Sequence, residues 1–213
     1  MTENLLERVH GAVMEGKADE AAQTVQEALN TGISVNDILD KGLISAMDLV
    51  GEKFGEGEMF IPQVFWSAKA MQAGMDILKP HFDAADRPDW GKVVIGTAKG
   101  DIHDIGKNLV AIMLEGAGFQ VIDLGVDVAA ERFVDVATEE KADVIAISAL
   151  LTTTMQSMAE VVSLLRERDL PSLKVIIGGA PVDMDFCREI GAHAYGIDAM
   201  DGVKKVKELL SGC

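Results

Sequence analysis

The chain changes its hydrophobic pattern once, close to residue 83. Before that point, apolar residues recur at three- and four-residue spacing, as in Leu5, Val9 and Val13. This spacing is typical of amphipathic helices. Polar or glycine-containing breaks divide the region into four segments, and they fall at 16–19, 31–34 and 55–58. Four helices with short connections predict a four-helix bundle.

The second half alternates short apolar, β-rich runs with amphipathic stretches. The predicted strand and helix pairs are 93–98 with a helix from 105, 120–124 with 129–140, 144–148 with 152–168, 174–177 with 183–190, and 194–197 with 199–210. Nearly continuous apolar strands are typical of a parallel sheet that is covered on both faces. We therefore predict a flavodoxin/Rossmann-like, doubly wound five-stranded parallel sheet with strand order 2-1-3-4-5. Ligands of such sheets bind at the carboxyl ends of the strands, near the switch point between the first and third strands.

A polar segment that contains Pro88 and has no periodicity separates the two halves (DAADRPDWGK, residues 83–92). Such composition is typical of a linker. The predicted domains are therefore a helical domain over 1–84, a linker over 85–91 and an α/β domain over 92–213.

Composition narrows the possible partners. The 213 residues carry 35 Asp and Glu against 19 Lys and Arg, which gives a formal net charge of −16. Such a chain repels nucleic-acid phosphates and anionic membranes, so we predict neither as a partner. No apolar run reaches the roughly 18 residues of a membrane span, and the first residues lack the basic and apolar regions of a signal peptide, so we expect neither a membrane span nor secretion. Two cysteines, Cys187 and Cys213, do not make a disulfide scaffold, so we expect a reducing, cytoplasmic location.

The most informative loop follows the first predicted strand and reads GDIHDIGK from Gly100 to Lys107. Its histidine, His103, is flanked by carboxylates at the expected ligand edge. Imidazole is a frequent metal ligand, and a ligating histidine usually donates its other N–H to a carboxylate or a carbonyl. One histidine is too few for a zinc site. A metal held here must bring most of its own ligands, as the metal of a tetrapyrrole-type macrocycle does.

Two other interpretations of this loop stay open. It could be a helix N-terminus whose acidic residues interact favourably with the helix dipole. A nucleotide-phosphate site is a weaker alternative, because there is no Walker sequence and Ala98 stands where a dinucleotide fingerprint beginning at Gly96 needs its second glycine.

Polar and small residues also follow the third and fourth predicted strands. The segment from Ser148 to Thr154 carries hydroxyl groups, which either contact a ligand or cap a helix. The pair Gly178-Gly179 allows a close backbone approach to a ligand, or makes a tight turn.

The spacing of these signals is more specific than any one of them. Asp101-x-His103-x-x-Gly106 is followed by Ser148-x-Leu150 and then by Gly178-Gly179. With this set the chain resembles the cobalamin-binding family that includes the B12 modules of methionine synthase and the corrinoid proteins of methyltransferase systems. The segment 51–64 (GEKFGEGEMFIPQV) is similar to part of the helical cap domain of that family. The resemblance spans nearly the whole chain.

The resemblance implies a cofactor, namely cobalamin or a related corrinoid whose cobalt cycles between methyl-Co(III) and Co(I). It implies that His103 is the lower cobalt ligand, that Asp101 accepts a hydrogen bond from the other ring nitrogen, and that Ser148 extends this relay. A carboxylate in that position raises the basicity of the imidazole and fixes its tautomer.

The resemblance also implies a set of cofactor contacts. In the α/β domain these are Gly100, Asp101, Ile102, His103, Asp104, Ile105, Gly106, Ser148, Leu150, Thr152, Gly178, Gly179, Tyr195 and Ala199. In the helical domain, residues that cover the upper corrin face are Phe54, Ile61, Val64 and Phe65. For Val64 and Phe65, a place in the bundle core explains the pattern equally well.

The resemblance implies a methyl-carrier subunit to which no catalytic residue is assigned. Its partners would be a substrate-specific corrinoid methyltransferase and a second methyltransferase that passes the methyl group to coenzyme M or tetrahydrofolate, with a reductive activase as a further candidate. An alternative is the small subunit of an adenosylcobalamin-dependent mutase, although the cap-like segment argues against it. A light- or B12-sensing regulator would need a DNA-binding module. A flavodoxin-like signalling domain without a cofactor would leave the spaced motifs unexplained.

Overall fold

The computed structural model describes residues 2–82 and 91–210, and the chain divides into two compact units. One unit lies within residues 1–89, together with Glu115–Gly118, and the other is made of the remaining residues to the C-terminus. Positions 85–90 of the predicted linker lie outside the described residues. The predicted domain boundaries therefore stay a prediction.

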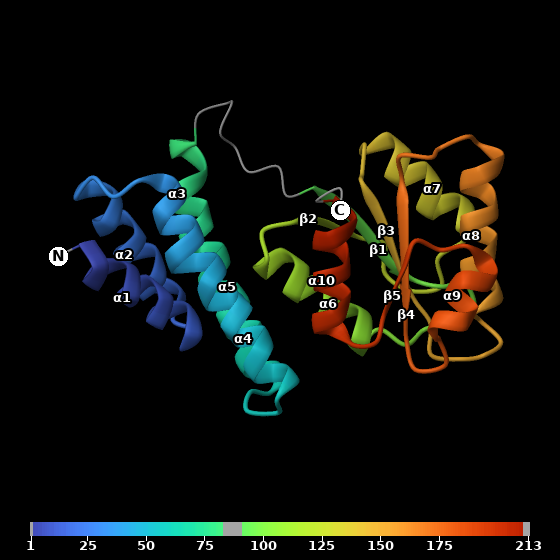
Figure 1. Cartoon of the computed structure of the whole chain (residues 1–213), viewed down its shortest axis with the longest axis horizontal. Coiled ribbons are helices and arrows are strands. Elements are labelled where there is room, and N and C mark those ends of the chain that lie inside the picture. The colour runs from blue at the N-terminus through green and yellow to red at the C-terminus, as the bar shows by residue number, and fades with distance from the viewer. Residues whose placement is uncertain (1, 83–90, 211–213) are drawn as a thin grey trace. The chain divides into compact units, whose positions relative to one another are not determined.

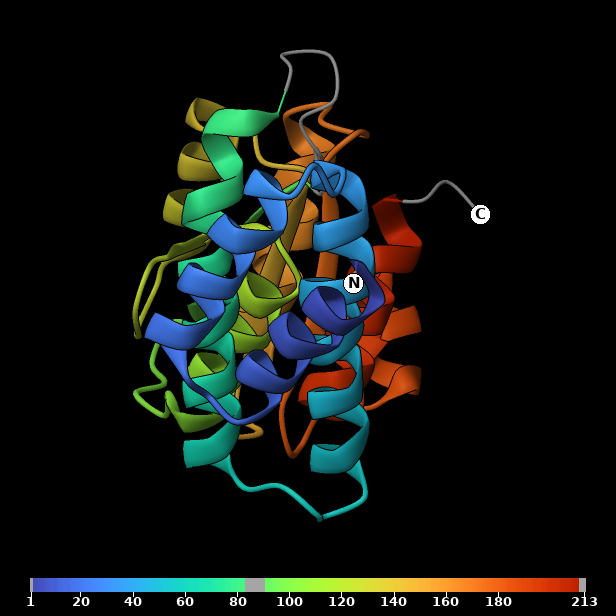
Figure 2. The same ribbon diagram turned by 90° about the vertical axis from the view of Figure 1, so that its left-hand side faces the viewer.

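The first unit is helical, as the spacing of its apolar residues predicts (Figure 1). Its elements are α1 (Thr2–Met14), α2 (Ala18–Asn30), α3 (Val35–Asp37), the π-helix η1 (Ile38–Ile44), α4 (Ser45–Gly55), α5 (Ile61–Leu78) and the 3-10 helix η2 (Lys79–His81). Ser34 caps α3 by accepting a hydrogen bond from the Asp37 N–H at 3.0 Å. Because α3, η1 and α4 follow one another without a break, they form one long helix, and the described residues of this unit form four long helical segments. Figure 2 shows α4 and α5 joined by the short loop at their lower end.

The second unit is a five-stranded, all-parallel sheet with helices on both faces. Its elements are β1 (Lys92–Thr97), α6 (Ile105–Gly116), β2 (Gln120–Asp123), α7 (Ala130–Glu139), β3 (Val144–Ser148), α8 (Gln156–Glu167), β4 (Lys174–Gly178), α9 (Met184–Ile190), β5 (Ala194–Gly196) and α10 (Ala199–Leu210). The order β2-β1-β3-β4-β5 confirms the predicted topology. Figure 1 shows α6 and α10 on one face of the sheet and α7, α8 and α9 on the other.

One helix begins later than the sequence predicts. The expected helix over 152–168 is α8 over Gln156–Glu167, and turns occupy 152–155. The physical reason is local, because the Thr154 N–H closes a turn by donating to the Leu151 carbonyl oxygen at 3.0 Å. This turn holds polar groups at the carboxyl edge of the sheet instead of placing them inside a helix.

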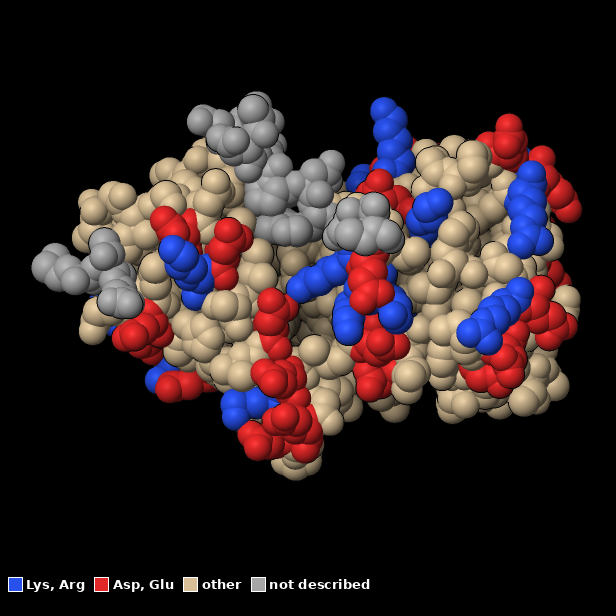
Figure 3. All heavy atoms as spheres, in the orientation of Figure 1, with Lys and Arg blue, Asp and Glu red and all other residues tan. Residues whose placement is uncertain are grey.

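Acidic side chains outnumber basic ones on the face that Figure 3 presents, in agreement with the net charge of −16. Within the described residues, no helix is both long enough and apolar enough to span a lipid bilayer.

Candidate functional site

The loop between β1 and α6 carries His103 at the carboxyl edge of the sheet. Thr97, at the end of β1, is fully buried, and its hydroxyl donates to the His103 carbonyl oxygen at 3.0 Å. The Asp104 carboxylate accepts a hydrogen bond from the side-chain amide of Asn108 at 3.0 Å, which fixes the first turn of α6. The backbone of His103 is therefore held on both sides, while its side chain is 48% exposed.

Asp101 lies beneath this histidine and is completely buried. Its Oδ1 accepts from the His103 ring Nδ1 at 2.7 Å and from the His103 backbone N–H at 3.0 Å. Its Oδ2 accepts from the Leu150 N–H at 2.7 Å, the Leu151 N–H at 3.3 Å and the Thr154 hydroxyl at 2.8 Å. One carboxylate therefore ties the histidine loop to the turn that follows β3.

These hydrogen bonds decide the charge of Asp101. Burial alone raises the pKa of a carboxyl group, but the donors from Leu150, His103 and Thr154 outweigh burial and hold the pKa of Asp101 far below its ordinary value. The carboxylate is an acceptor only, so Nδ1 of His103 carries the proton in this pair. The lone pair of the neutral imidazole then resides on Nε2, the nitrogen that can bind a metal.

In the structure, the hydrogen bonds to Asp101 come from other residues than Ser148, and the relay through Ser148 stays a prediction. The hydroxyl group that donates to Asp101 belongs to Thr154, whose side chain is buried. The Ser148 residue ends β3 and lies in the neighbouring cavity instead. The run Thr152-Thr153-Thr154 contained the missing hydroxyl, but the sequence alone did not indicate which of the three points inward.

A second loop supports the histidine loop and was not expected from the sequence. Asp127, between β2 and α7, has a left-handed backbone with φ of 55°. Its N–H donates to the Asp101 carbonyl oxygen at 2.9 Å, and its Oδ1 accepts from the Gly100 N–H at 2.7 Å. Asp tolerates this conformation better than most residues. Asp127 thus positions the backbone that leads into His103.

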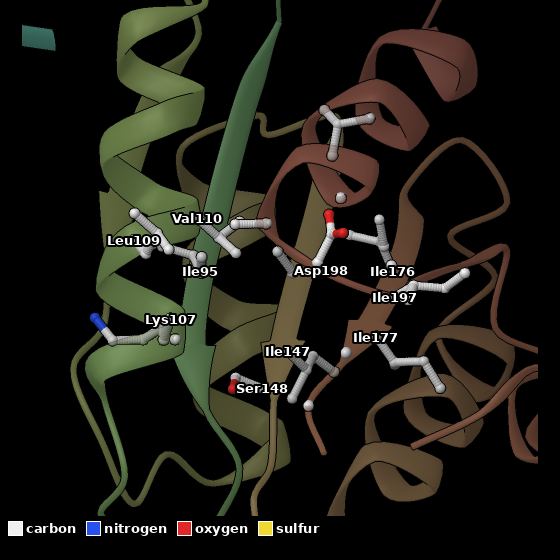
Figure 4. Close-up of a pocket in the computed structure, with 18 of the residues that line it drawn as sticks. Ile95, Lys107, Leu109, Val110, Ile147, Ser148, Ile176, Ile177, Ile197 and Asp198 are labelled. Carbon is white, nitrogen blue, oxygen red and sulfur yellow. The ribbon is translucent and has the colours of Figure 1, made fainter. Parts of the chain in front are cut away.

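A cavity of about 360 Å³ opens beside the site, between the sheet and the helices α6 and α10 (Figure 4). We call it the α6–α10 cavity. Its lining residues are Ile95, Gly106, Lys107, Leu109, Val110, Ala146, Ile147, Ser148, Ile176, Ile177, Gly178, Gly179, Ala180, Gly196, Ile197, Asp198, Ala199, Gly202 and Val206. The volume lies in the range of small-molecule and cofactor sites.

Glycines make this cavity open. A Cβ atom at Gly106 or Gly202 would meet no other atom within 4 Å, so packing within the protein does not require glycine at either position. At Gly179, by contrast, φ is 127° and a Cβ would lie 1.9 Å from the Ala149 carbonyl oxygen, so the chain's own backbone requires glycine there. The missing side chains at Gly106 and Gly202 let a large, flat ligand approach the backbone closely. The residues present therefore fit a bulky group that brings its own metal and accepts one imidazole.

The structure brings together part of the predicted contact set. Five of its members line the α6–α10 cavity, namely Gly106, Ser148, Gly178, Gly179 and Ala199. Six form the β1–α6 loop and the start of α6, over residues 100–105, and the side chains of Ile102 and Ile105 are 74% and 75% exposed there. Leu150 contributes its N–H to Asp101.

Two predicted contacts lie away from the cavity lining. Thr152 is exposed in the turn before α8. Tyr195 packs against the core cluster beneath α7, α8 and α9, whereas its neighbour Gly196 lines the cavity. Successive strand residues point to opposite faces, so both cannot face the same side.

In the helical unit, the four predicted cap residues differ in exposure. Phe54 is half-buried, Ile61 is 45% exposed and Val64 is fully buried. Phe65 is half-buried and packs edge-to-face on Trp66, with ring centroids 5.4 Å apart. Their role over a corrin ring stays a prediction.

Comparison with known proteins decides the family. Residues 91–204 and residues 5–79 each match a family model described as a B12 binding domain. The chain belongs to the B12-binding family of corrinoid proteins. It is 41% identical to trimethylamine corrinoid protein 2 of Methanosarcina mazei, over 98% of this chain and 97% of that protein.

Solved structures agree with this assignment. The corrinoid protein described here is similar to a chain of the methanol:cobalamin methyltransferase complex MtaBC from Methanosarcina barkeri, with a TM-score of 0.86, 34% identity, and coverage of 99% of this chain and 81% of that one. It is also similar to a cobalamin-binding protein from Desulfitobacterium hafniense, with a TM-score of 0.78, 33% identity, and coverage of 96% and 98%.

The cofactor of the chain is thus cobalamin or a related corrinoid, as the sequence motifs predict. Among the residues that the structure describes, no group of three or more His, Cys, Asp or Glu side chains could hold a metal ion.

Proposed function

We propose that this corrinoid protein carries a methyl group on cobalt from a substrate-specific methyltransferase to a second methyltransferase, which passes it to coenzyme M or tetrahydrofolate. The observation that carries the proposal is the pairing of His103 with a buried, ionised Asp101 beside the glycine-lined α6–α10 cavity. Support comes from relatives named for trimethylamine and from the methanol:cobalamin methyltransferase complex.

In this proposal His103 binds cobalt through Nε2. Asp101 keeps Nδ1 protonated and makes the imidazole a stronger donor. Thr154 and the two backbone N–H groups of Leu150 and Leu151 keep Asp101 ionised although it is buried. The chain therefore supplies a ligand of fixed tautomer and adjustable basicity.

When it is bound, the corrinoid supplies the cobalt centre on which the methyl group is carried. The α6–α10 cavity would hold the nucleotide tail of the corrinoid. Gly178, at the end of β4, and Gly179 line this cavity at the carboxyl edge of the sheet. A reductive activase that restores the reduced cofactor is a further proposed partner.

The first prediction tests this function directly. The His103→Ala protein retains some corrinoid, because the cavity is intact, but loads and unloads methyl groups about tenfold or more slowly, because cobalt has lost its protein ligand. The matched control is His81→Ala, at an exposed histidine in η2 of the helical unit. The measurement is methyl transfer to and from the reconstituted protein, with trimethylamine, dimethylamine and methanol as donors and the corresponding methyltransferases present. Unchanged transfer kinetics together with an unchanged visible spectrum in His103→Ala would contradict the proposal.

A further inference from the structure

The α6–α10 cavity changes its chemistry from its entrance to its inner end. At the carboxyl edge of the sheet, Ser148 on β3 is in register with Gly178 on β4. Two residues further inside, Ile95, Ala146 and Ile176 form one row across β1, β3 and β4. None of these three side chains is more than 5% exposed. Leu109, Val110 and Val206 extend the same aliphatic surface from the helices.

The polar side chains of the cavity are already engaged or lie at its entrance. Lys107 is ion-paired with Asp123, and Figure 4 shows its amine pointing away from the labelled aliphatic side chains. Asp198 is exposed, and its Oδ1 accepts from the Asp201 N–H at 2.8 Å, which caps α10. The backbone of the inner row is engaged in the sheet ladder. The inner end therefore offers aliphatic contacts and no free polar side chain.

The shape of a corrinoid tail places its parts in a definite order. The tail runs from the corrin ring through phosphate and ribose to a terminal base, so a tail that enters at the carboxyl edge brings its base to the aliphatic row. We infer that the α6–α10 cavity selects corrinoids whose base is of the dimethylbenzimidazole type over those whose base is adenine. This inference rests on the proposed function, in which the cavity receives the tail.

The physical reason is desolvation. Adenine carries an exocyclic amine and ring nitrogens that would lose water without gaining a partner, and each unpaired buried polar group is costly. The methyl groups of dimethylbenzimidazole instead bury apolar surface against Ile95 and Ile176. The expected discrimination is about tenfold to a hundredfold in affinity.

The experiment compares three corrinoids on the full chain freed of cofactor: dimethylbenzimidazolyl cobamide, adeninyl cobamide and cobinamide, which lacks the tail. Equilibrium dialysis is carried out with cobalt reduced to Co(I), because four-coordinate cobalt holds no lower ligand and the affinities then report the tail alone. We expect the benzimidazole form to bind at least about tenfold tighter than the adenine form, and cobinamide to bind more weakly than the benzimidazole form. Equal affinities of the two bases, tighter binding of adenine, or cobinamide binding as tightly as the benzimidazole form would overturn the inference but leave the methyl-carrier role standing. Failure of all three to bind would refute the proposed function as well.

A substitution at the inner row gives an independent test. Ala146→Ser adds one hydroxyl to the row with little change in volume, so it should lower the preference for benzimidazole over adenine by about threefold or more. The matched control is Ala137→Ser, at a buried residue of α7 that belongs to the core on the other face of the sheet, and its preference should equal that of the wild type. Because the ratio of the two affinities is compared between proteins, any difference intrinsic to the free corrinoids cancels. An unchanged ratio in Ala146→Ser would count against the inference.

Discussion

At the scale of single residues, the site depends on the hydrogen bonds that the buried carboxylate of Asp101 accepts. Asp101 accepts five hydrogen bonds, two from His103 and three from the turn after β3. A buried carboxylate with fewer donors would take up a proton, and the charge-assisted hydrogen bond that it accepts from the imidazole would be lost. The hydroxyl of Thr154 is the only side-chain donor besides the histidine among these five.

Thr154 provides the second prediction. Thr154→Val removes the hydroxyl with little change in shape, and it should lower the free energy of unfolding of the cofactor-free protein by about 1–3 kcal/mol, because Asp101 stays buried with one donor fewer. Thr153→Val, at the exposed neighbouring residue, should change the same quantity by less than about 0.5 kcal/mol. Urea unfolding followed by circular dichroism measures both. Equal stability of the two variants would show that the hydroxyl does not support the carboxylate.

The sequence contains the ligand and its first partner but not the complete hydrogen-bond set. His103 and Asp101 are two residues apart, so a local motif is enough to pair them. Thr154 lies 53 positions away from Asp101, and only the fold brings it there. Ser148, which the motif favours, ends its strand beside the cavity instead. Which of several hydroxyls faces inward depends on turn geometry that a single sequence does not specify.

At the scale of elements, the loop between β2 and α7 holds the histidine loop in place. The third prediction concerns Asp127. Asp127→Ala should cost about 1–3 kcal/mol of unfolding free energy, because alanine is strained at a φ of 55° and the Gly100 N–H loses its acceptor. Asp127→Asn tolerates the same backbone and keeps an acceptor, so it should remain close to the wild type.

Hydrogen exchange makes this prediction specific. In Asp127→Ala the amides of Gly100 and His103 should exchange faster than in Asp127→Asn, because their loop has lost its support. If the two variants are equally stable and exchange these amides at the same rate, Asp127 has no positioning role.

The start of β5 carries the fourth prediction, which concerns pH. The ring Nδ1 of His193 accepts a hydrogen bond from the Val175 backbone N–H at 3.0 Å. The backbone N–H of His193 donates to the Val175 carbonyl oxygen at 2.9 Å. Burial of the ring, together with the nearby Lys174 and Arg166, lowers the pKa of His193. The folded protein thus favours the neutral ring. Its contribution to stability is complete above the unfolded pKa of about 6.5 and is lost as the pH falls from there through the lower pKa of the folded state.

Replacing this histidine separates its titration from its hydrogen bond. His193→Asn keeps an acceptor for the Val175 N–H but cannot be protonated, so its unfolding free energy should fall less than that of the wild type between pH 7 and pH 5. His81→Asn, at an exposed histidine, should follow the wild type. Parallel curves for wild type and His193→Asn would exclude this role.

The assignment of segments to helices and strands is the part of the structure that the sequence predicts best. The change from helical spacing to short apolar runs predicts both units, and the strand order is the one expected of a flavodoxin-like doubly wound sheet. The sequence predicts too early a start for α8 because residues 152–155 contain no strong helix breaker. The side of β5 that carries Tyr195 was also not determined, because a three-residue strand has too little alternation to indicate its buried face.

At the scale of the whole molecule, the helical and the α/β units both match B12-binding models, and relatives of the same length align over nearly the entire chain. Neither unit by itself supplies a complete set of cobalt ligands from the residues described. The account therefore rests on one bond between His103 and a cobalt atom that the corrinoid brings.

The most direct test is electron paramagnetic resonance of the Co(II) form of the reconstituted protein, prepared once with natural-abundance histidine and once with ¹⁵N-histidine. This fifth prediction is that each cobalt line shows a three-fold nitrogen splitting that becomes two-fold with the label, and that both splittings are absent in His103→Ala and retained in His81→Ala. Splitting that the histidine label leaves unchanged, or that persists in His103→Ala, would contradict the central claim.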